Sequence, residues 1–134
     1  MKRLITWAAV SVLVAGVAAC TPTGSVPMFP ADPDEGSLLA RFQGELALRD
    51  DCLVIVDREE SWAVAWASPA TTWNPSTRTI DVRGTVVQLG QPVGLVGGEM
   101  HVNEDTVDSY EWVVRPNEGC LRQDGFWFAW DVEQ

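Results

Sequence analysis

Short runs of alternating apolar and polar residues dominate the chain after Ser37, and no segment of useful length has apolar residues every three to four positions. Phe42, Leu46 and Leu48 alternate with polar or small residues, and residues 52–56 form a short, continuous apolar run. A period of two is typical of strands with one buried face, and such a run is typical of a central strand. We therefore expect strands at 42–48, 52–56, 62–67, 80–89, 93–96, 112–114 and 126–132.

Turn-forming residues separate these expected strands. Asp50-Asp51 favours a tight turn, and residues 68–77 are expected to form a polar loop around Trp73. Gly84 is expected to bend one long strand, and residues 103–110 to allow a single helical turn capped by Asn103. The pattern favours one all-β domain, residues 38–134, folded as a small antiparallel barrel that is OB-like, with a small β-sandwich as the alternative.

The first twenty residues have the layout of a secretory signal. Lys2 and Arg3 precede an apolar stretch at 4–17, and small residues follow up to Cys20. The stretch is shorter than the roughly 20 apolar residues of a spanning helix, and this order of segments is typical of a cleaved signal peptide. We expect residues 1–19 to be removed.

The end of this segment, Val17-Ala18-Ala19-Cys20, resembles the lipobox of bacterial lipoproteins. The resemblance implies cleavage before Cys20, acylation (palmitate) of its thiol, and a lipid-anchored position on the extracytoplasmic side of the cell membrane or outer membrane. A plain secretory signal with an incidental cysteine is the alternative. Residues 20–37, rich in Pro, Gly, Ser and Asp, are expected to be a flexible linker. Met28 and Phe29 are its large apolar residues, and docking of these two side chains on the domain is the alternative.

Two cysteines, Cys52 and Cys120, remain once Cys20 is assigned to lipid. Outside the cytoplasm an even pair of thiols usually forms a disulfide. A metal or redox role is the alternative, although the sequence holds no C-x-x-C motif. We expect a Cys52–Cys120 bond that ties the second strand to the approach of the last strand.

A wider set of glycines, aromatics and cysteines resembles a group of functionally uncharacterised small bacterial envelope lipoproteins. The matching residues are Gly44-Glu45-Leu46, Cys52-Leu53, Ala65-Trp66-Ala67-Ser68-Pro69, Gly84, Gly90, Gly97-Gly98, Cys120 and Phe126-Trp127-Phe128. The chain departs from the group's pattern at Ser68 and at Gln91-Pro92. The resemblance implies a disulfide-linked β domain at the cell envelope and carries over no catalytic residue.

Charge and motifs exclude several kinds of function. The net charge of −10 argues against nucleic acid, because phosphate binding needs clustered Lys and Arg. The acidity keeps the domain soluble or, as the alternative, serves a cationic partner. His101 is the sole histidine, so neither a metal site nor a cofactor is expected, although His101 with Glu99 and Glu104 at a strand end leaves a small hydrolase as an alternative. The acidic run from Asn103 to Asp108 lacks EF-hand spacing.

Tryptophan provides the candidate binding residues. Trp62, Trp66 and Trp130 fit the pattern of core residues, whereas Trp73 falls in the polar loop and Trp127 on the face opposite Phe126 and Phe128. Exposed aromatic side chains mark binding surfaces, so Trp73 and Trp127 are the candidate ligand-binding residues. The expected function is a non-enzymatic binding module of the bacterial envelope with a protein or glycan partner. The alternatives are a small envelope hydrolase and a purely structural envelope component.

Overall fold

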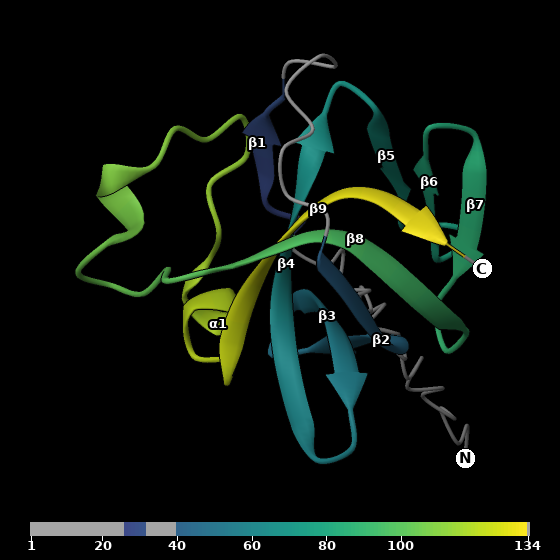
Figure 1. The fold of residues 1–134 in the computed structure, drawn as a ribbon, viewed down its shortest axis with the longest axis horizontal. Coiled ribbons are helices and arrows are strands. Elements are labelled where there is room, and N and C mark those ends of the chain that lie inside the picture. The colour runs from purple at the N-terminus through teal and green to yellow at the C-terminus, as the bar shows by residue number, and fades with distance from the viewer. Residues whose placement is uncertain (1–25, 32–39, 134) are drawn as a thin grey trace, which may run out of the picture.

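The structure is a computed structural model that describes residues 26–31 and 40–133 (Figure 1). Within these residues, five strands form a closed ring in the order β4-β3-β2-β8-β9, with β9 returning to pair with β4. The strands are β2 (Ala40–Arg49), β3 (Cys52–Asp57), β4 (Glu60–Ser68), β8 (Pro92–Met100) and β9 (Gly125–Glu133). The prediction of a small all-β barrel is confirmed.

The ring differs from the expected antiparallel barrel at one pairing. β4 and β9 run parallel, from Trp62 opposite Gly125 to Trp66 opposite Ala129, whereas the other four neighbouring pairs are antiparallel. A closed ring with an odd number of strands cannot reverse direction at every step, so a five-stranded ring needs a parallel pair. The long connection between β8 and β9 provides the crossover that this parallel pair requires.

A second, three-stranded sheet lies beside the barrel (Figure 1) and corrects two sequence expectations. Its strands are β5 (Thr71–Asn74), β6 (Thr79–Val82) and β7 (Thr85–Gln88). Residues 68–77 therefore contain a strand rather than only a loop. The expected single strand at 80–89 is a hairpin, because Arg83 and Gly84 have φ angles of 51° and 87°, which is the geometry of a tight two-residue turn.

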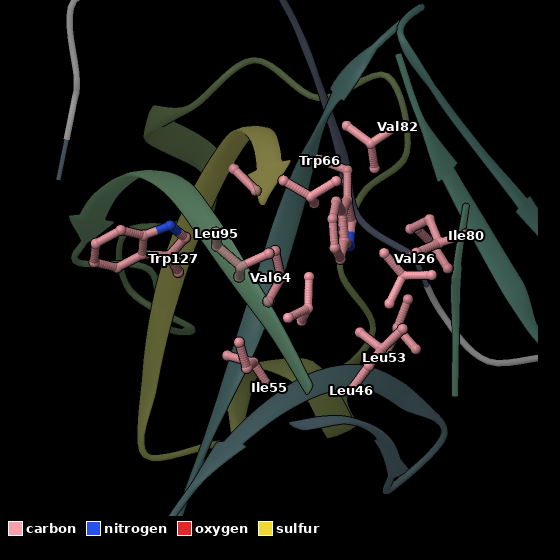
Figure 2. Close-up of a cluster of buried hydrophobic side chains, with 14 residues drawn as sticks. Val26, Leu46, Leu53, Ile55, Val64, Trp66, Ile80, Val82, Leu95 and Trp127 are labelled. Atoms are coloured by element: carbon pink, nitrogen blue, oxygen red, sulfur yellow. The ribbon is translucent and has the colours of Figure 1, made fainter. Parts of the chain in front are cut away.

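Apolar side chains form two clusters, one inside the barrel and one on its outer face. The interior cluster has Trp66 near its centre and is closed on one side by Ile80 and Val82 of β6 (Figure 2). The outer cluster covers β3, β4 and β9 and contains Val54, Ala63, Ala65, Phe126 and Phe128. Both faces of β4 are buried as a result, since its successive side chains point alternately into the two clusters.

A bulge in β9 changes which face its last residues occupy. Gly97 pairs with Ala129 and Val96 with Asp131, so Trp130 is left out of the ladder. One extra residue reverses the faces of all residues that follow it. Val132 therefore joins the interior cluster, and the prediction that it shares a face with Phe126 is wrong.

The described part of the expected linker is ordered against the barrel. β1 (Met28–Pro30) pairs in parallel with Trp66–Ser68 at the edge of β4. The expectation of a flexible linker therefore fails for residues 26–31. Residues 1–25 and 32–39 lie outside the described residues, and with them the expected signal peptide and Cys20.

The connection between β8 and β9 carries two short helices, η1 (Val107–Ser109) and α1 (Glu118–Leu121). The side chain of Asn103 accepts hydrogen bonds from the backbone N–H groups of Asp105 and Thr106, so it closes a turn four residues before η1. Residues 112–114 form only an isolated bridge, between Val114 and Met28, rather than a strand. No helix in the described part of the chain is long and apolar enough to cross a membrane.

Candidate binding surfaces

The predicted disulfide is confirmed and fixes the long connection to the barrel. Cys52 opens β3, Cys120 lies in α1, and the two buried residues have Cα atoms 5.2 Å apart. Asn117 Nδ2 donates to the carbonyl oxygen of Asp51 at 3.0 Å and thus adds a second link between α1 and the β2–β3 turn. Gly119 is required here, because a Cβ at this position would lie 1.9 Å from the carbonyl oxygen of Asp50.

The two candidate tryptophans lie at different depths. Trp127 is 6% exposed and belongs to the interior cluster, so the expectation that it is exposed is wrong. Its ring packs against Phe42 at a centroid distance of 5.3 Å. Trp73 is half-buried on β5, opposite Ile80, and packs against the same cluster. The structure therefore does not bring the two tryptophans together on one open surface.

A shallow groove of about 550 Å³ crosses the outer surface where β2, β8 and the end of β9 meet. We call it the acidic groove; it is lined by Gln43, Gly44, Glu45, Val56, Pro92, Val93, Gly94 and Glu133. Two of these lining residues, Gly44 and Gly94, are glycines. Gly44 is also required by packing, because a Cβ there would lie 2.5 Å from the carbonyl oxygen of Val56.

Carboxylates dominate the charge of this region. Glu45 and Glu133 are both exposed, and Arg41 makes an ion pair with Glu133 at 3.1 Å. Glu45 also lines a neighbouring depression of about 550 Å³ that includes Asp50, Asp51 and Arg78. The two depressions together hold more negative than positive side chains. The sequence analysis names neither Glu45 nor Glu133 as a candidate binding residue, because only the pairing of β2, β8 and β9 brings them to the same groove.

A smaller pocket of about 210 Å³ lies beside His101. Glu99, His101 and Asp124 line it, whereas Glu104, expected near His101, does not. Asp124 is engaged in the fold, since its Oδ2 accepts a hydrogen bond from the backbone N–H of Ser61 at 2.9 Å. Among residues 26–31 and 40–133 no group of three or more His, Cys, Asp or Glu side chains is arranged to hold a metal ion.

The outer cluster contains a slot of aromatic rings that the sequence analysis missed. We call it the aromatic slot, and it is formed by Phe128, Trp130, Tyr110, Trp112 and Phe126. Phe29 packs against two of these rings, with its ring 4.8 Å from that of Phe128 and 5.1 Å from that of Trp130. The slot joins β9 to the long connection that precedes it, and Phe29 adds a segment that is distant from both in sequence.

Comparison with known proteins adds no relative, because no family model, curated protein or solved structure matches this chain. The fold places the chain in the class of small β-barrel domains held by one disulfide.

Proposed function

We propose that the protein is a non-enzymatic binding module of the bacterial envelope, anchored by a lipid on Cys20, which holds a cationic segment of an envelope protein in the acidic groove. The proposed anchor is supported by the charged, apolar and small-residue order of the first twenty residues. The disulfide fits an oxidising compartment outside the cytoplasm. The acidic groove is the observation that carries the binding proposal.

The lining of the groove matches one kind of occupant. The groove is shallow and runs along the strands, so it suits an extended peptide segment that lies across the surface. Val56 and Pro92 offer apolar contact, and the exposed carboxylates of Glu45 and Glu133, the second of which is paired with Arg41, attract Lys or Arg side chains. The net charge of −10 adds long-range attraction for a cationic partner and speeds encounter.

The proposal is tested by titrating the protein with a synthetic peptide of alternating Lys and Leu and following backbone amide chemical shifts. We expect the largest shifts at Gly44 and Gly94. The double variant Glu45→Gln/Glu133→Gln should weaken binding by about tenfold, since exposed charge pairs contribute up to about 1 kcal/mol each. Shifts confined to another surface would overturn the proposal.

A matched control separates the groove from overall charge. Glu59→Gln/Glu111→Gln removes the same two charges from exposed positions that do not line the groove. This variant should bind the peptide within about twofold of the natural protein. Equal weakening by both double variants would show that the peptide responds only to net charge, and would contradict a site in the groove.

The hydrolase alternative has one observation in its favour, namely that Glu99, His101 and Asp124 line the same pocket. An imidazole beside two carboxylates is a combination used for acid–base chemistry. The test is hydrolysis of ester and glycoside substrates by the natural protein and by His101→Ala. Activity that is lost in the variant would favour the hydrolase, and activity that is retained would exclude His101 as its base.

A further inference from the structure

Residues 26–31 are held on both sides by backbone hydrogen bonds. On the barrel side, Trp66 N–H donates to Pro27 at 2.9 Å and Ala31 N–H donates to Ser68 at 3.0 Å. On the other side, Met28 N–H donates to the carbonyl oxygen of Val114 at 2.9 Å. The segment therefore lies as an extended strand between the edge of β4 and the long connection, close to both in Figure 1.

Two buried side chains anchor this segment. Phe29 is 5% exposed in the aromatic slot, where its ring stacks on Phe128 with an interplanar angle of 19°. Val26 enters the interior cluster, near Trp66 and Ile80 in Figure 2. Burial of one phenylalanine side chain shifts a docking equilibrium by on the order of a hundredfold.

The local sequence prepares this extended conformation. Val26 precedes Pro27 and Phe29 precedes Pro30. A residue before proline is restricted to extended backbone conformations, so both anchoring residues lose little freedom when the segment docks. Pro30 has no N–H to donate, which suits its place at the end of an edge strand.

We infer that the aromatic slot is a binding site for this chain's own N-terminal segment, and that docking holds the barrel close to the membrane. Val26 lies six positions after Cys20, and a fully extended chain of that length spans about 20 Å. If the segment were undocked, Ala40, twenty positions after Cys20, would lie up to about 70 Å from it. The inference about distance rests on the proposed lipid anchor.

Docking limits the partners that the barrel can meet. A barrel within about 20 Å of its anchor reaches partners at the bilayer surface, whereas an undocked barrel also reaches deeper into the envelope. The acidic barrel is also repelled by anionic lipid headgroups. Docking therefore opposes this repulsion and keeps the acidic groove near the membrane.

The experiment measures docking and distance separately. Hydrogen exchange of the full chain reports the Met28 amide, which should exchange on the order of a hundredfold more slowly than in the free peptide. Energy transfer from the protein's tryptophans to a dansyl headgroup lipid, in phosphatidylcholine vesicles carrying the lipidated protein, reports distance. Phe29→Asp should remove the protection and lower the transfer, because the charged side chain is excluded from the slot.

Ser76→Asp is the matched control, since it adds the same charge at an exposed position of the β5–β6 turn and should change neither readout. Unprotected exchange at Met28 in the natural protein would overturn docking. Equal energy transfer in the natural protein and Phe29→Asp would overturn the inference about distance. An unacylated Cys20 would instead contradict the anchor in the proposed function, while the exchange measurement on that protein would still decide whether the segment docks.

Discussion

Removal of the Cys52–Cys120 disulfide should lower the free energy of unfolding by about 4 kcal/mol. The bond joins residues 68 positions apart. In the chain-entropy model, closing a loop of this length restricts the unfolded chain by about 4 kcal/mol. A domain of this size has a net stability of about 5–15 kcal/mol, so the loss is a large fraction of the total.

Thermal and urea unfolding of the oxidised protein, the reduced protein and Cys52→Ala/Cys120→Ala measure this loss. At about 5 °C of melting temperature per kcal/mol, both altered forms should melt about 20 °C lower. The urea midpoint should fall by about 2 M for a slope of about 2 kcal/mol/M. Reductant should have no further effect on the double variant, which controls for effects of the reagent.

A free energy of unfolding of the reduced protein within about 1 kcal/mol of that of the oxidised protein would contradict this prediction. That result would mean that the contacts of α1 with the β2–β3 turn, rather than the covalent bond, hold the long connection in place. If the double variant lost stability and the reduced protein did not, the loss would come from the cavity left by the two sulfur atoms rather than from the missing bond.

Three further predictions concern packing, capping and charge. Gly97→Ala should lower the free energy of unfolding by about 1–3 kcal/mol in thermal melts, because its Cβ would lie 1.7 Å from the carbonyl oxygen of Phe128. Gly94→Ala, whose Cβ would lie 3.4 Å from its nearest atom, should stay within about 1 kcal/mol of the natural protein. Equal losses of stability in the two variants would contradict this geometry. Asn117→Ala should lower the free energy of unfolding by about 1–2 kcal/mol in the same assay, because Asn117 Oδ1 caps α1 by accepting a hydrogen bond from Cys120 N–H at 2.8 Å. An unchanged melting temperature would show that the cap contributes nothing to stability. Binding of the Lys-Leu peptide should weaken by about tenfold between low and high salt in a calorimetric titration, and a salt-independent affinity would exclude the charge-based account of the acidic groove.

Much of the barrel could be predicted from the sequence because its strands carry strong local patterns. β2, β3, β4, β8 and β9 each contain an expected strand, and the disulfide followed from the count of cysteines. β5 was missed, because Thr, Asn and the surrounding prolines give no apolar alternation. The sequence predicts only a bend at Arg83-Gly84, where the structure has a turn, because Arg-Gly is a weaker turn signal than Asn-Gly.

The binding surfaces were harder to predict because they depend on contacts between distant segments. Trp127 was expected to be exposed, since a strand with one apolar face usually has one wet face. In the barrel the outer face of β9 is covered by the long connection and by Phe29, so both faces are buried. The prolines that follow Val26 and Phe29 were the available signal that this segment is extended, but the linker-like composition around them obscured it.

The most direct test of the central claim is the intact mass of the protein purified from its native membrane, measured before and after reduction. We expect the mass of a chain that begins at Cys20 and carries acyl groups, with a gain of two hydrogen atoms on reduction of the Cys52–Cys120 bond. A chain that carries no acyl group would contradict the membrane-anchored binding module, and an unchanged mass on reduction would contradict the disulfide on which the fold depends.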